Sequence, residues 1–521
     1  MSIPYRHAEN IAVNQRAKLP APRELANCDA LLLILPESET RIDWKALPHG
    51  EHLAQRARRH RQTGADVKAT PKDWETELPT PHGTRVRVVH AKAAATGFER
   101  LDSARHWVQP LLAGDPLNVS ILIAPELAQA TATAGMEASV LALLAATCPL
   151  PSRKSAQEPP ARLARIDCYG EGTLNIDRLR AQTQGNHLAR WLTQLPGNEL
   201  RPGDYRTLAT ALAREHGWET EFLDRKALTR RKAGAFLAVT QASSTDDGGL
   251  LRLSYRPKAS RSRTAAKSKT RGMQPRLALV GKGICFDTGG VNLKSAKSMH
   301  GMHEDMEGSA VALGTLLALS LLKVDFAVDC WLALAENHIG PQAYKPNDVV
   351  TACNGTRIEI VHTDAEGRMV LADALALAAR GKPALIIDYA TLTGACVYAL
   401  STRYSGVFGN RDDLLATLTE AGKASGERVW PFPMDADFDD MLKSDIADIK
   451  QCTLDSEADH ILAARFLNRF VPEDIAWLHV DLAAGNHKGG LAHIPSDVTG
   501  FGVGLTVRAL LEHDLLNAAS R

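Results

Sequence analysis

Two blocks of the sequence, residues 280–308 and 358–375, bring acidic and basic side chains close together. Their ionisable candidates are Lys282, Asp287, Lys294, Asp305, Asp364, Glu366 and Arg368. Three aspartates and one glutamate gathered in one place would repel one another unless cations lay between them. Two divalent metal ions supply about that much positive charge, so the blocks predict a two-metal site.

Each of these residues also has a simpler interpretation. A single Asp or Glu after a strand is usually a helix cap or a solvated loop residue. Lys282 can bind a metal only as the neutral amine, which requires a pKa far below the usual value of about 10.4. Alternatively, Lys282 forms a salt bridge with one of the aspartates. The combination of residues indicates a metal site more specifically than any one of the residues does.

Predicted strands position both blocks. A strand over Leu277–Val280 continues to Lys282, where a glycine-rich loop begins. A second strand, Arg357–Val361, leads into the loop before a helix over Glu366–Arg380. Open α/β sheets bind ligands beyond the carboxyl ends of their strands, so the two blocks are expected to meet there.

The chain of 521 residues is too long for one compact core. Short apolar runs alternate with helical patterns throughout, which indicates an α/β fold. We predict a smaller N-terminal α/β domain over residues 1–175 and a linker helix over 176–198. A larger catalytic α/β domain, with a mixed central sheet flanked by helices, then covers residues 199–521.

Composition excludes several classes of protein. With 45% hydrophobic and 23% charged residues the chain is not disordered, and a net charge of +1 gives no global attraction to nucleic acid. The N-terminus has no apolar signal segment, and the longest near-apolar stretch, Ala310–Leu322, is too short to span a bilayer. The eight cysteines form no CxxC pair. A cytoplasmic protein without a membrane segment is expected.

One segment departs from this charge balance. Residues 256–276 contain eight basic residues and no acidic one. A solvated insertion between two strands is the preferred interpretation, and contact with nucleic acid or an acidic partner is the alternative.

The two blocks resemble those of the leucyl aminopeptidase family, also called cytosol aminopeptidases, which are dinuclear metallopeptidases. The family motif NTDAEGR has the counterpart HTDAEGR at residues 362–368, and VGKGICFDTGG at residues 280–290 matches a second motif. Further matches are AEN at 335–337, ATLTGA at 390–395, WPFP at 430–433 and TGFGV at 499–503. The resemblance begins near residue 195 and covers about three-fifths of the chain.

The resemblance implies a role for each matching position. Asp287 and Glu366 would bridge two metals, Asp364 would complete one site, and Lys282 with Asp305 would complete the other. Lys294 would point at the substrate carbonyl, and Arg368 would hold a bicarbonate-like anion near the attacking water. The pocket for the N-terminal side chain would be lined by Met302, Thr391 and Gly394.

An oxygen-rich donor set with one amine suits zinc, manganese or magnesium, so the sequence does not identify the metal. The resemblance also implies peptides with a free N-terminus as substrates, and a homohexamer. A DNA-binding regulatory protein built on the same scaffold is the alternative function, and residues 256–276 are its only support. A metal-binding protein without activity is a third hypothesis, against which the intact Lys294 and Arg368 argue.

The sequence departs from the family pattern around the expected site. His362 replaces the usual Asn of the motif, and Glu307 replaces a small residue. His303 and Glu304 are also unusual, and residues 456–467 replace a glycine-rich run and introduce Asp459 and His460. These changes remove no expected ligand, but they leave the preferred N-terminal residue open.

Overall fold

The computed structural model describes residues 4–37, 42–63, 73–156, 159, 161–243, 245–257, 276–455 and 457–521. The basic segment therefore lies almost wholly outside the described residues. The chain forms two compact units. One contains residues 3–184 and 488–497, and the other contains residues 185–487 and 498–521 together with the first two residues.

The N-terminal unit is a six-stranded sheet with helices. Its strands, in spatial order, are β1 (Ala12–Arg16), β6 (Arg165–Tyr169), β5 (Asn118–Ile123), β2 (Ala30–Pro36), β4 (Arg85–Ala91) and β3 (Trp74–Glu77). Only β3 runs antiparallel to its neighbour. The helices are α1 (Gly50–Thr63), α2 (Gly97–Leu112) and α3 (Gln129–Thr147). Among the described residues, α3 alone is long and apolar enough to cross a membrane, but 72% of its apolar window is buried inside the structure.

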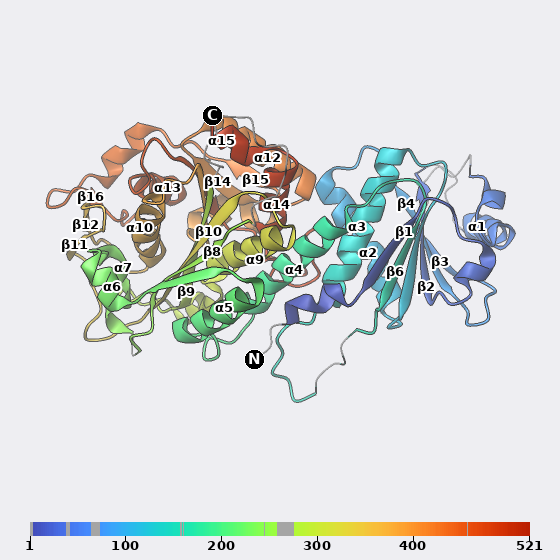
Figure 1. Cartoon of the computed structure of the whole chain (residues 1–521), viewed down its shortest axis with the longest axis horizontal. Coiled ribbons are helices and arrows are strands. Elements are labelled where there is room, and N and C mark those ends of the chain that lie inside the picture. Colours follow the sequence, from blue (N-terminus) through green and yellow to red (C-terminus); the bar gives the residue numbers. More distant parts are fainter. Residues whose placement is uncertain are drawn as a thin grey trace, which may run out of the picture. The chain divides into compact units, whose positions relative to one another are not determined.

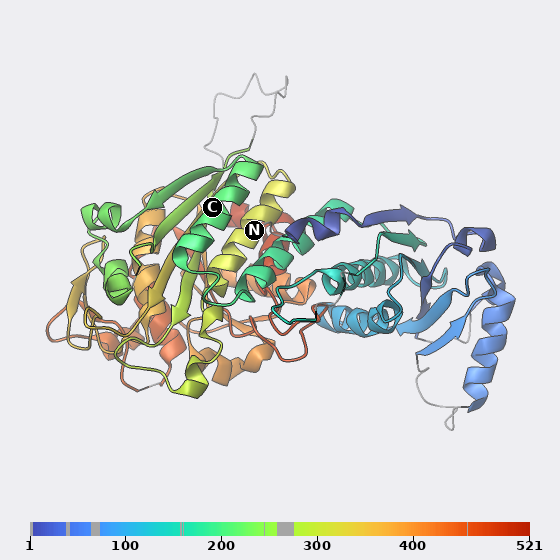
Figure 2. The same ribbon diagram turned by 90° about the horizontal axis from the view of Figure 1, so that it is seen from below.

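The C-terminal unit is built on a mixed eight-stranded sheet (Figures 1 and 2). In spatial order its strands are β15 (Val429–Pro431), β14 (Ser405–Gly409), β17 (Ala476–Asp481), β13 (Leu385–Ala390), β9 (Arg276–Asp287), β10 (Ala327–Asn337), β8 (Gly249–Tyr255) and β7 (Glu219–Leu223). The four central strands, β17 to β10, are mutually parallel. Their carboxyl ends therefore lie at one edge. The mixed α/β fold predicted from the sequence is confirmed.

Helices cover both faces of this sheet. After α4 (Ile176–Thr193), the helices of this part of the chain are α5 (Pro202–His216), α6 (Arg225–Arg230), α7 (Gly234–Val239), α8 (Ala296–Met299), α9 (Glu307–Leu321), α10 (Glu366–Ala379), α11 (Gly394–Leu400), α12 (Asp412–Ser425), α13 (Asp459–Asn468), α14 (Val503–Leu511) and α15 (Leu515–Ala519). In Figure 1, α10 lies to the left of the strands and α9 to the right. Adjacent residues of β9 explain this, because Gly281 faces α9 and Lys282 faces the first turn of α10.

Strand β9 is longer than the sequence predicted. It does not end at Lys282 but pairs with β10 as far as Asp287. Gly283, which the sequence placed at the start of a loop, is instead part of the strand, and a Cβ atom there would lie 2.9 Å from the Ala333 carbonyl oxygen of β10. A Cβ atom at Gly281 would lie 2.3 Å from the Cα of Ser309 in α9. The helix backbone thus packs directly on the strand backbone, and glycine is required by this close approach rather than by a turn.

The strand before the second block does not belong to the main sheet. β12 (Arg357–Glu359) pairs with β11 (Val349–Thr351) and with β16 (Ile449–Lys450) in a separate three-stranded sheet. The predicted strand is therefore present at that position, but it pairs outside the eight-stranded sheet. Its loop nevertheless reaches the edge where β9 ends, because Thr363 in that loop bonds to the Gly289 carbonyl at 2.6 Å.

Candidate active site

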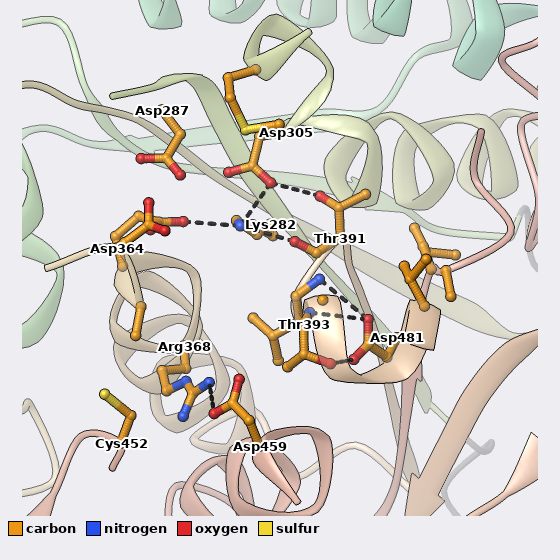
Figure 3. A pocket seen from close by; sticks show the side chains of 18 of the residues that line it. Lys282, Asp287, Asp305, Asp364, Arg368, Thr391, Thr393, Cys452, Asp459 and Asp481 are labelled. Carbon is orange, nitrogen blue, oxygen red and sulfur yellow. Dashed lines mark hydrogen bonds and ion pairs between the residues drawn. The ribbon is translucent and has the colours of Figure 1, made fainter. Parts of the chain in front are cut away.

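A single pocket of about 570 Å³ in the C-terminal unit gathers the predicted site residues. All ten line it: Lys282, Asp287, Lys294, Met302, Asp305, Asp364, Glu366, Arg368, Thr391 and Gly394. Figure 3 shows most of the charged ones converging on one region. Their individual roles remain predictions.

Four carboxylates and two lysines form the polar centre of this pocket. The Lys282 ammonium lies 2.7 Å from Asp305 and 2.9 Å from Glu366. The Lys294 ammonium lies 2.9 Å from Asp287 and 2.5 Å from Asp364. Two positive charges thus face four carboxylates, so the centre carries an excess of negative charge.

The donor set fits divalent cations. One carboxylate oxygen from each of Asp287, Asp364 and Glu366 lies within 4.8 Å of the other two. Asp305 Oδ2 and Glu366 Oε2 are buried and have no hydrogen-bond partner among the described residues. Burial, together with the Asp287 charge, raises the pKa of Glu366 to about 8. A cation would compensate these carboxylates and give the unpaired oxygens a partner.

The Lys282 ammonium forms two salt bridges in the structure, and its role as a metal ligand stays a prediction. Burial alone would lower its pKa, but Asp305, Glu366 and Asp287 together outweigh burial and raise the pKa above its ordinary value. A bound dication would reverse this balance, because it would repel the ammonium and neutralise the same carboxylates.

Hydrogen bonds hold the metal-binding candidates in place. Asn337, the last residue of β10, donates to Asp287 Oδ1 at 2.8 Å and to the Thr363 carbonyl at 3.0 Å. It therefore ties the two blocks together. His362 Nδ1 accepts a hydrogen bond from the Asp364 backbone at 3.3 Å, so this histidine supports the loop locally.

Two further residues position the pocket wall. Gln451 accepts from the backbone of Val361 and His362 at 3.2 Å and donates to the Ala365 carbonyl at 3.0 Å. Asp481, the last residue of β17, accepts from the Thr393 hydroxyl at 2.6 Å and so fixes the turn between Thr391 and Gly394. Sequence reasoning missed both residues. The apolar run before Asp481 could have identified it as another acid at a strand end.

Glu307 occupies an unusual environment in the same pocket. It is the first residue of α9 and is 2% exposed, and its Oε1 atom has no hydrogen-bond partner among the described residues. Burial, and to a lesser extent the charge of Glu304, raises the pKa of Glu307 to about 8. The side chain is therefore mostly protonated at neutral pH.

Glu307→Gln is expected to reduce the loss of stability at alkaline pH. Because the folded-state pKa lies above the unfolded value, the folded protein holds the extra proton, and this stabilisation disappears as pH rises from about 4.5 to about 8. From pH 5 to pH 9, the free energy of unfolding of the metal-free Glu307→Gln protein should therefore fall by about 2–4 kcal/mol less than that of the metal-free wild type. Urea midpoints of both proteins at the two pH values measure this. Equal pH dependence in the two proteins would contradict it.

Arg368 forms an ion pair within the chain. Its guanidinium, in the first turn of α10, contacts the Asp459 carboxylate at 2.8 Å (Figure 3). A second guanidinium nitrogen donates to the Gln451 carbonyl at 3.2 Å. The chain itself therefore supplies an anion to Arg368. Asp459 was noted in the sequence as a departure from the family pattern, but its contact with Arg368 was not predicted.

Comparison with known proteins identifies the family of the chain. Residues 187–507 match the model of the cytosol aminopeptidase family, catalytic domain. A probable cytosol aminopeptidase of Corynebacterium glutamicum is 41% identical over 62% of this chain and 62% of its own length. Others of that name, from Parasynechococcus marenigrum and Prochlorococcus marinus, are each 40% identical, over 72% and 67% of this chain and 74% and 70% of their own lengths.

The aligned part thus spans slightly less than two thirds of the Corynebacterium relative. Residues 187–507, which match the family model, contain both predicted blocks, the pocket and the carboxylate cluster, so the resemblance seen in the motifs extends through most of the C-terminal unit. The chain belongs to the cytosol aminopeptidase family, a family of peptidases, and residues 187–507 are its catalytic domain.

Proposed function

We propose that this chain is a metal-dependent aminopeptidase, a hydrolase that releases N-terminal amino acids from peptides. The observation that carries the proposal is the gathering of four carboxylates and two lysines in one pocket of a chain from this family. Divalent cations bound there would polarise the scissile carbonyl and activate a water. Zinc, manganese and magnesium all suit such a donor set.

In this proposal each side chain has a defined task. Asp287 and Glu366 would be shared between two cations, with Asp364 completing one site and Lys282 with Asp305 the other. The Lys294 ammonium would donate a hydrogen bond to the carbonyl oxygen and stabilise the negative charge that develops on it. Met302, Thr391 and Gly394 would line the space for the N-terminal side chain.

The remaining expectations rest on the family. A homohexamer and a cytoplasmic location are proposed on that ground. None of the eight cysteines, all of them among the described residues, forms a disulfide, which is consistent with a reducing compartment. The DNA-binding hypothesis is not carried forward. Its only support was the basic segment, of which residues 258–275 lie outside the described residues, and no comparison supports it.

A substrate panel after metal removal tests the proposal. Aminoacyl-p-nitroanilides and dipeptides would be assayed after chelation and after addition of zinc, manganese or magnesium. We expect cleavage only with added metal and only when the α-amine is free, so N-acetylated forms of the same peptides serve as the control. If metal binds but no peptide is cleaved, the proposed activity is wrong.

A further inference from the structure

The ion pair between Arg368 and Asp459 is an unusual feature of the pocket. The two residues come from different helices, because Arg368 lies in the first turn of α10 and Asp459 is the first residue of α13. Both line the pocket. The Arg368 side chain is 3% exposed, whereas the Asp459 side chain is 25% exposed. The carboxylate is thus partly open to the pocket, and the guanidinium lies behind it.

A buried guanidinium needs a counter-anion. Without one, the cost of removing its charge from water is several kcal/mol. In this pocket the nearby carboxylates of the metal centre are already engaged by lysines, since Glu366 contacts Lys282 and Asp364 contacts Lys294. Asp459 is the carboxylate that contacts Arg368 directly.

The neighbouring thiol does not compete for this role. Cys452 also lines the pocket and lies near Arg368 (Figure 3). Burial is the main reason that the pKa of Cys452 is raised, to about 11. The thiol is therefore neutral at physiological pH, and the anion beside Arg368 is the Asp459 carboxylate.

We propose that Asp459 permanently occupies the position of the free anion expected at Arg368, so that the pocket contains its own carboxylate and needs no bicarbonate. The inference rests on the proposed aminopeptidase function. During hydrolysis the water oxygen bonds to the carbonyl carbon, and Asp459 accepts the proton released from that water. When the C–N bond breaks, the same proton passes to the leaving nitrogen, so Asp459 ends the cycle ionised.

The chain offers a closely matched control for this pair. Asp439 contacts Arg465, also on α13, at 2.7 and 2.8 Å, and its side chain is 23% exposed. Neither residue lines the pocket. Asp439→Asn therefore breaks an Arg–Asp pair on the same helix, at similar exposure, without touching the site.

The first arm of the test measures hydrolysis in buffer freed of carbon dioxide. Wild type and Asp439→Asn should work equally well with and without added bicarbonate. Asp459→Ala should be slower by about 100-fold or more without the anion, because a positioned proton acceptor contributes about that much. Added bicarbonate or formate should restore much of the rate to Asp459→Ala, but not to Asp459→Asn, whose amide still fills the space.

The second arm does not depend on activity. Binding of ¹³C-bicarbonate to the metal-free proteins, followed by NMR line broadening, should occur with Asp459→Ala and not with wild type or Asp439→Asn. Bicarbonate binding to wild type, bicarbonate-dependent hydrolysis by wild type, or an Asp459→Ala enzyme as fast as wild type without the anion would each overturn the proposal. If no protein hydrolyses any peptide, the aminopeptidase function fails, and the binding arm still decides whether Asp459 fills the anion position.

Discussion

Replacing Asp364 by alanine is expected to lower peptide hydrolysis by at least about 1,000-fold, the largest effect that we predict for one substitution. Its carboxylate is one of the three whose oxygens lie within 4.8 Å of one another. Loss of this ligand should weaken one of the two metal sites, and two-metal hydrolysis depends on both ions for its rate. Calorimetric titration of the chelated protein with zinc or manganese should show one tight site instead of two.

The side chain of Asp364 is 28% exposed, so its removal should leave the fold intact. Asp413→Asn is the matched control, because Asp413 pairs with Arg411 on the surface at 2.8 Å, away from the pocket. It should keep wild-type activity and both metals. An Asp364→Ala protein that hydrolyses peptides at the wild-type rate would refute the assignment of Asp364 as a ligand.

Lys294→Met should lower kcat by about 100- to 1,000-fold while both metals remain bound. The expected cause is the loss of one charged hydrogen-bond donor to the developing oxyanion, which is typically worth that factor. KM should change little, because the donor acts mainly in the transition state. Steady-state kinetics combined with metal analysis of the same samples separates the two effects.

Lys423→Met provides the comparison, since Lys423 forms an exposed salt bridge with Glu420 on α12 at 2.7 Å. That variant should behave as wild type. If Lys294→Met instead loses its metals together with its activity, Lys294 is needed to assemble the centre. The proposed role at the carbonyl oxygen would then be wrong.

The parts of the site that could be predicted from the sequence are those carried by continuous segments. Lys282, Asp287 and Lys294 follow one another along a strand and its loop, and Asp364 with Glu366 precedes a helix, so the strand-end rule was enough to bring them together. The helix predicted over Glu366–Arg380 was likewise predictable from local apolar periodicity, and the structure has it as α10 over Glu366–Ala379.

The parts that could not be predicted depend on partners far away in the sequence. Asp459 contacts Arg368 across 91 residues, and Asp481 holds Thr393 across 88. No local pattern encodes those pairs. The separate sheet that contains β12 could not be predicted, because its partner β16 has only two residues and leaves no strand pattern in the sequence. β9 appeared to stop early because glycines usually mark turns, whereas here they admit a neighbouring backbone.

The close contact between α9 and the sheet has a consequence for how this enzyme can evolve. A Cβ atom at Gly281 would collide with α9, and one at Gly308 would lie 2.1 Å from the Tyr389 carbonyl oxygen. Substitutions at these two positions are therefore expected to displace α9 and to change the spacing between Lys282 and Asp305. New substrate preferences are accordingly expected to arise elsewhere in the pocket, for example at residues 453–455 before α13, which line it.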